Sequence, residues 1–222
     1  MPRGFFSHTW ALFLVSLLFP CSGLFLRRRH RLGILTLLLG AGIASLIGLV
    51  TNLGGLGAGV FFGILLLFPW WLFQAYQSSL YEPGTIAQTF RLIWTHAHDI
   101  RLIGLMFGLA AITDIWIIIQ NPDYQLNVFC SRPSGLLGLL SKVQSPLFHI
   151  AIGYGFVRLL KWSFFIYLTY AGYGLLNATV NWVCMGYGRI RTVFIVSLIV
   201  FTIYIILRRN RFGQERSPAP EL

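Results

Sequence analysis

Long apolar runs bounded by short basic clusters constrain this chain more than any other feature of its sequence. Segment 33–73 contains no charged residue, and the basic cluster 27–31 (RRRHR) precedes it. A helix of about 20 apolar residues crosses a bilayer core of roughly 30 Å. Only 10 % of the chain is charged and 56 % is hydrophobic, so we expect an all-α, polytopic integral membrane protein.

These runs predict a helical bundle of about seven spans in a single transmembrane domain over 1–211, followed by a disordered tail over 212–222. The predicted spans are about 5–26, 33–50, 56–75, 102–120, 143–157, 162–187 and 192–207. Segment 143–157 is short and contains Pro146, so it either spans the membrane or enters a cavity as a half-buried helix. Residues 1–23 are either a cleaved signal peptide or, as we expect, part of a retained first helix.

The basic residues indicate an orientation with the N-terminus outside and the C-terminus inside. Twelve of the 17 arginines and lysines would then be cytosolic. The remaining five would lie outside, namely Arg3, Arg132, Lys142, Arg189 and Arg191. Because the net charge of +11 follows the ends of apolar runs, we expect the lipid bilayer and no nucleic acid as a partner.

Segment 86–101 is predicted to be an amphipathic helix in the membrane interface. Its apolar residues recur every three or four positions, at Ile86, Phe90, Ile93, Trp94, Ala97 and Ile100. We expect this helix to lie along the interface and to continue without a break into the span 102–120.

Two ionisable residues fall within predicted spans, where a polar side chain needs a partner or trapped water. Asp114 is either a residue that handles substrate or protons, or a carboxyl group bonded to a neighbouring helix. His149 is either a general base toward a hydroxyl or a histidine bonded to a neighbouring backbone.

Span 162–187 carries a polar row on one helical face. Its members are spaced three and four apart: Ser163, Tyr167, Tyr170, Gly174, Asn177 and Asn181. Such a row either bonds to another helix or lines a polar cavity. Within it, Tyr170, Asn177 and Asn181 are candidates for substrate binding.

Patterns for metals, cofactors and disulfides are absent. Cys21, Cys130 and Cys184 lie far apart, so we predict neither a disulfide framework nor a zinc site. His96 and His98 are two residues apart and therefore do not share a helical face. No glycine loop follows a strand, and we expect no bound cofactor.

One block of the chain is similar to a known family. Arg91-Leu92-Ile93-Trp94 precedes a polar stretch and then Arg101-Leu102-Ile103-Gly104. This block resembles the conserved sequence block of fungal wax-synthase-like membrane-bound O-acyltransferases. Leu102 stands where the family has glycine. Asp114-Ile115 and Tyr170-Ala171-Gly172-Tyr173 sit where the family places an acid and the following helix.

The resemblance implies a multi-pass protein of the endoplasmic reticulum. It would transfer an acetyl or longer acyl group from acyl-CoA to the hydroxyl of a lipophilic alcohol or terpenoid secondary metabolite. Arg91 and Arg101 would then contact the coenzyme A phosphates. The family's catalytic Trp-His motif has no counterpart after His149, so His149 and Asp114 become the candidate catalytic residues.

Two alternatives stay open. The chain is a non-catalytic membrane subunit or a truncated relative of the family, or it is a small membrane terpenoid cyclase in which Asp114 supplies the proton.

Overall fold

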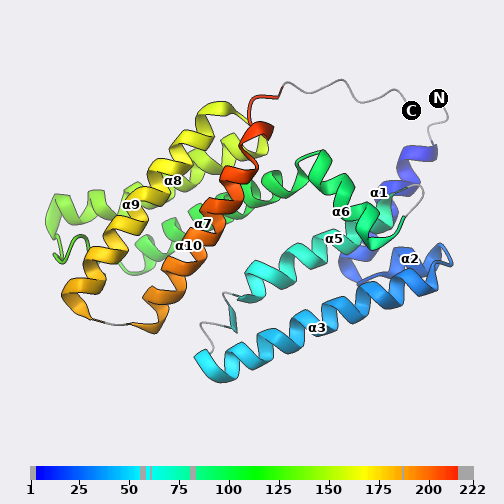
Figure 1. The fold of residues 1–222 in the computed structure, drawn as a ribbon, viewed down its shortest axis with the longest axis horizontal. Helices are drawn as coiled ribbons and strands as arrows, with labels where there is room; N and C mark the ends of the chain where they lie inside the picture. The colour runs from blue at the N-terminus through cyan, green and yellow to red at the C-terminus, as the bar shows by residue number, and fades with distance from the viewer. Residues whose placement is uncertain (1–3, 56–58, 61, 81–83, 187, 215–222) are drawn as a thin grey trace. The chain divides into compact units, whose positions relative to one another are not determined.

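The chain is built from helices, as the sequence predicts (Figure 1). The computed structural model describes residues 4–55, 59–60, 62–80, 84–186 and 188–214. It is 82 % helix and forms no strand in that part of the chain. The sequence predicts one transmembrane domain over 1–211, and the internal contacts divide the chain into two compact units, Met1–His96 and Ala97–Leu222.

Three described helices are long and apolar enough to cross a membrane. They are α3 over His30–Asn52, α7 over His98–Gln120 and α8 over Gly135–Val157. A shorter apolar helix covers Phe194–Leu207. Large apolar side chains such as Ile112 and Trp116 of α7 point away from the protein, as expected for a lipid-facing surface.

The described residues of the first unit form helices (Figure 1). They are α1 (Gly4–Leu18), α2 (Ser22–Leu26), α3 (His30–Gly54), the π-helix η1 (Gly63–Leu67), α5 (Phe68–Ser79) and α6 (Ile86–Thr95). The run predicted as one span, 5–26, is divided into α1 and α2 on either side of Pro20. Gly23 N–H donates to Ser16 Oγ at 2.8 Å, so α2 packs back against α1.

Buried glutamines hold this unit together. Gln74 is fully buried, accepts from Cys21 N–H at 2.7 Å and donates to Ser16 O at 2.6 Å. Gln77 bonds Thr36 of α3 at 3.1 Å and Thr89 of α6 at 3.2 Å. Amides in an apolar interior are tolerated when their hydrogen bonds are made, so these two residues set the register of the helices around α5.

The prediction that the amphipathic helix continues without a break into the next span is wrong. A capping box between Thr85 and Gln88 begins α6, and this helix ends at Thr95. Ala97 then has a left-handed backbone with φ of 53°, and α7 begins at His98. A left-handed residue cannot continue a right-handed helix, which is why the segment 86–101 forms two helices.

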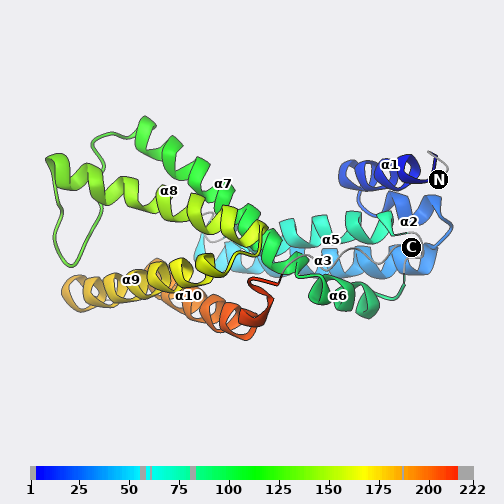
Figure 2. The ribbon, with the colours of Figure 1, turned by 90° about the horizontal axis from the view of Figure 1, so that it is seen from above.

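The described residues of the second unit form four long helices and a short 3-10 turn. They are α7 (His98–Gln120), α8 (Gly135–Val157), α9 (Lys161–Met185), α10 (Arg189–Leu207) and η2 (Arg209–Arg211). Helices α7 and α8 lie side by side, as do α9 and α10 (Figures 1 and 2). A buried cluster that includes Ile100, Ile152, Phe156 and Tyr167 joins them.

Helix α8 begins earlier than the sequence predicts. We expected a short segment over 143–157, whereas the helix starts at Gly135 and passes through Pro146. Proline is tolerated within membrane helices, so it does not mark the end of the span here. The preceding loop therefore covers only residues 121–134.

The disordered tail predicted over 212–222 does not begin at Phe212. This side chain is 5 % exposed, and its ring centroid lies 5.0 Å from that of Phe156 and 5.7 Å from that of Phe164. Gly213 N–H also donates to Leu159 O at 2.6 Å. The rest of the predicted tail, from residue 215, lies outside the described residues.

An ion pair joins the start of α7 to the end of α10. Arg208 donates from Nε and Nη2 to the two carboxylate oxygens of Asp99, each at 2.8 Å. Tyr204 OH donates to the same carboxylate. Arg208 is 2 % exposed, so a planar guanidinium is matched to a carboxylate away from solvent.

Candidate functional site

Three helices of the second unit bring Asp114, His149 and Tyr170 together. His149 of α8 places Nδ1 2.9 Å from Asp114 Oδ2 of α7 and Nε2 2.9 Å from the hydroxyl of Tyr170 of α9. Ser145, one turn before His149, donates to Asp114 Oδ2 at 2.7 Å. The sequence predicts these residues separately, and helix packing brings them into one connected row of close polar contacts.

Packing and bonding fix the orientation of the His149 ring. His149 is 8 % exposed, and its ring centroid lies 5.4 Å from that of Phe107. A carboxylate at Nδ1 favours the tautomer that carries its proton there, which leaves Nε2 as the acceptor for the Tyr170 hydroxyl. The partners of His149 are thus side chains of two other helices, and Asp114 is bonded to α8.

A cavity of about 390 Å³ adjoins this chain of residues. It lies among α7, α8, α9, α10 and the loop 121–134, and its polar lining includes Asp114, Tyr124, Lys142, Ser145, Tyr170 and Asn181. His149 is not among the lining residues, so Tyr170 and Asp114 are the members of the chain that a bound molecule would contact. Burial raises the pKa of the Tyr124 hydroxyl, and the negative charge of Asp114 raises it further.

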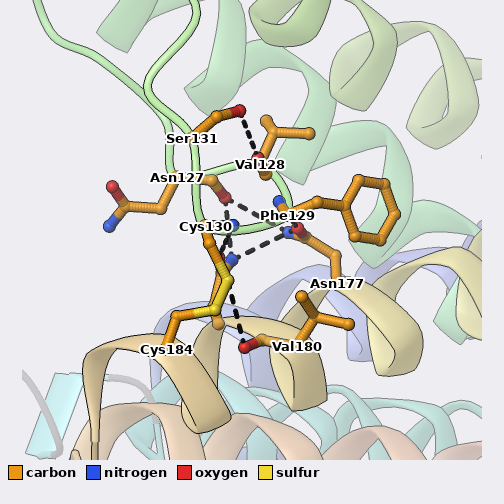
Figure 3. Close-up of a disulfide and its surroundings, with 9 residues drawn as sticks. Asn127, Val128, Phe129, Cys130, Ser131, Asn177, Val180 and Cys184 are labelled. Atoms are coloured by element: carbon orange, nitrogen blue, oxygen red, sulfur yellow. Dashed lines mark hydrogen bonds between the residues drawn. A yellow bond between two sulfur atoms is a disulfide. The ribbon is translucent and has the colours of Figure 1, made fainter.

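The two asparagines of the polar row bind the loop that lines this cavity, and Figure 3 shows Asn177 beside that loop. Asn177 accepts from Phe129 N–H and Asn181 from Cys130 N–H, both at 2.8 Å. Both also donate to Asn127 O, at 3.3 and 2.9 Å. Although both line the cavity, their amides are engaged by the protein, so they shape the site by holding the loop in place.

Cys130 and Cys184 form a disulfide, which the sequence analysis did not predict from their spacing (Figure 3). Their Cα atoms lie 5.9 Å apart, although 54 positions separate them in the sequence. Spacing along the chain does not reveal this pairing, because the loop reaches the end of α9 only after α8 and α9 have packed. Cys21 is a buried free thiol.

Replacing both Cys130 and Cys184 by serine is expected to lower the free energy of unfolding by about 2–4 kcal/mol, because the bridge restricts a long loop of the unfolded chain. Thermal unfolding of the purified protein in detergent measures this loss. Cys21→Ala, which keeps the bridge, is the control. Equal unfolding temperatures for the double variant and this control would contradict the prediction.

Ser145 and Lys142 are members of the site that the sequence analysis did not select. Residues 142, 145 and 149 follow the spacing of one face of α8, and all three lie on the side of α8 that faces the site. The signal was therefore present in the sequence. For Lys142 it was hidden because the predicted span began only at residue 143.

The two arginines predicted to bind coenzyme A do not line this cavity. Arg91 lies on α6 of the first unit and is exposed. Arg101 lies in the first turn of α7, about 20 Å along the helix axis from Asp114. Among the described residues, no group of three or more histidine, cysteine or acidic side chains could hold a metal ion.

The cluster can hold a polar group of an apolar molecule and move a proton along a defined path. Its surroundings are apolar helices, and Tyr170, Asp114 and Ser145 are the members of the cluster that line the cavity. Comparisons with protein-family models, with curated proteins and with solved structures found no match to the chain.

Proposed function

We propose that this protein is a multi-pass membrane acyltransferase that acylates the hydroxyl of a lipophilic alcohol at the cavity beside Tyr170. The observation that carries the proposal is the row Asp114–His149–Tyr170: His149 Nδ1 lies 2.9 Å from Asp114 Oδ2, and His149 Nε2 is hydrogen-bonded to the Tyr170 hydroxyl at a cavity within apolar helices. The seven-span arrangement, the outer N-terminus and the endoplasmic reticulum belong to the same proposal. The resemblance of residues 90–104 to wax-synthase-like enzymes supports it.

The chain of residues supplies a general base for this reaction. The alcohol O–H would bond to the Tyr170 oxygen, and the Tyr170 proton would pass to His149 Nε2 as the alcohol proton passes to Tyr170. Asp114 stabilises the imidazolium that results, because its carboxylate lies 2.9 Å from Nδ1. Along this relay, the His149 imidazole and the Tyr170 hydroxyl separate the Asp114 carboxylate from the reacting oxygen.

Bond changes at the acyl group complete the reaction. The activated alcohol oxygen forms a C–O bond with the carbonyl carbon of an acyl thioester, and the C–S bond breaks. The proton held by the relay returns to the departing thiolate. Acyl-CoA is the donor that the family resemblance suggests, and its phosphates would need partners other than Arg91 and Arg101, which do not line the cavity.

Replacing His149 by alanine is expected to lower acyl transfer by about 10²–10⁴-fold, because the relay loses its proton acceptor. The rate is measured with purified protein in lipid nanodiscs, from the transfer of label from acetyl-CoA to a long-chain alcohol. Tyr170→Phe, which removes only the hydroxyl, is expected to show a similar loss.

Two variants outside the site control this experiment. Tyr154→Phe removes the hydroxyl of an exposed tyrosine on α8, and His96→Ala removes an exposed histidine at the end of α6, so both should retain the wild-type rate. A wild-type rate in the His149 variant would remove the relay from the mechanism.

A non-catalytic role is the second candidate, and one observation favours it. Asp114, Ser145, His149 and Tyr170 bond one another across α7, α8 and α9, which is also how polar residues join membrane helices. In that case the His149 variant would lose thermal stability, and the wild type would show no turnover of labelled acyl donor. A cyclase is less well supported, because Asp114 Oδ2 accepts a hydrogen bond from Ser145 and faces His149.

A further inference from the structure

We infer that Lys142 forms a binding site for the phosphate group of a membrane lipid in the cavity. Lys142 lies about two turns from the start of α8 and is 8 % exposed. Its ammonium donates to Pro122 O and lies 4.7 Å from the centroid of the Tyr124 ring. The residue also lines the cavity.

Within the described part of the chain, no carboxylate forms a direct ion pair with this ammonium. Among the described residues, the carboxylates within 4 Å of a basic group pair with His149 and Arg208. Asp114 lines the same cavity, but its contacts are Ser145 and His149. Because a buried charge without an opposite charge is costly, an anion in the cavity would stabilise Lys142.

Lys142 has donors to spare for such an anion. An ammonium carries three N–H groups, and the Pro122 carbonyl accepts from one of them. Tyr124, Gln144 and Ser141 also line the cavity and add polar groups beside Lys142. A cavity of about 390 Å³ falls in the size range of small-molecule sites, which is enough for a lipid headgroup.

The surroundings favour phosphate that arrives on a lipid. Helices α7 and α8, which wall the cavity, expose large apolar side chains such as Ile112, Trp116 and Leu147 on their outer surfaces. Acyl chains can lie along those surfaces while the phosphate reaches Lys142. The Cys130–Cys184 disulfide belongs to the same loop region, so this end of the unit faces an oxidising compartment and the leaflet on that side.

This inference does not depend on acyl transfer, because the expected readout is binding. Native mass spectrometry of the purified, detergent-solubilised protein would compare dioleoyl phosphatidic acid with dioleoylglycerol, which has the same chains and no phosphate. We expect the wild type to bind phosphatidic acid and Lys142→Gln to bind it about ten- to hundredfold more weakly, since a charge-assisted hydrogen bond is lost.

Two further variants distinguish a specific contribution of Lys142 to binding from general effects of charge and folding. Lys142→Arg keeps the charge and should keep most of the binding. Lys161→Gln alters the other lysine of the chain, which is exposed at the start of α9, and should bind phosphatidic acid as the wild type does. The Cys130–Cys184 bridge, measured by resistance to alkylation, shows that each variant is folded.

Three results would overturn the inference. The first is equal binding of phosphatidic acid by Lys142→Gln and the wild type. The second is equal binding of dioleoylglycerol and phosphatidic acid by the wild type. The third is saturation of the site by inorganic phosphate without any preference for the lipid, which would assign it to a free anion.

Discussion

Replacing Asp99 by alanine is expected to lower the free energy of unfolding by about 3–5 kcal/mol, because it leaves Arg208 buried without its carboxylate. Arg208 is 2 % exposed and donates twice to Asp99, with both bonds at 2.8 Å. A guanidinium stays charged at any pH near neutrality, so it cannot relieve this cost by losing a proton.

The pair lies at two helix ends, and this position adds to the expected loss of stability. Asp99 lies in the first turn of α7, where a negative charge interacts favourably with the helix dipole. Arg208 follows the last turn of α10, where a positive charge does the same. The alanine variant loses the ion pair, the bond from Tyr204 and the interaction of Asp99 with its helix.

Thermal or chemical unfolding in detergent measures the change, with Arg209→Gln as the control because Arg209 is the exposed neighbour of Arg208. A double variant, Asp99→Leu with Arg208→Met, should recover much of the loss, because removing both charges leaves none unpaired. If Asp99→Ala were as stable as Arg209→Gln, the buried pair would not stabilise the unit.

Gly153→Leu is expected to separate α7 from α8 and to destabilise the second unit by about 3 kcal/mol or more. A Cβ atom on Gly153 would lie 2.9 Å from Gly104 O and 3.0 Å from Gly108 N. A Cβ atom on Gly104 would lie 2.8 Å from Val157 N. The two backbones are therefore in direct contact, as small residues allow in membrane helices.

The neighbouring glycine provides a matched control. A Cβ atom on Gly108 would meet nothing within 4 Å, so Gly108→Ala should leave the stability unchanged or raise it slightly by favouring the helix. Gly153→Leu should also abolish the proposed acyl transfer, because Asp114 and His149 lie on the two helices that it separates. Retention of both stability and transfer in this variant would contradict the close packing of α7 and α8.

The apolar runs of the sequence predicted α3, α7 and the end of α8, because a helix is the structure that satisfies its own backbone in an apolar solvent. Asp114 and His149 were selected for the same reason, since a polar group at membrane depth needs a partner. Residue type and its position in a run were sufficient for both conclusions.

The start of α8 and the end of α6 could not be predicted in the same way. Ser134 and Gly135 resemble turn residues, and Pro146 resembles a helix breaker, yet α8 passes through all of 135–157. Ala97 is a strong helix former, yet its left-handed backbone separates α6 from α7. Local preference is weaker than the tertiary packing that decides both positions.

By itself, the sequence determined the helical class of this protein, three of its membrane-length helices and the polar residues that need partners. Only the tertiary structure decided which partners they have: Asp114 with His149, His149 with Tyr170, Cys130 with Cys184, and Arg208 with Asp99. The physical reason is that the period of a helix decides which residues share a face. Which faces meet depends on close contacts such as Gly104 with Gly153, which residues far apart in the chain make only after folding.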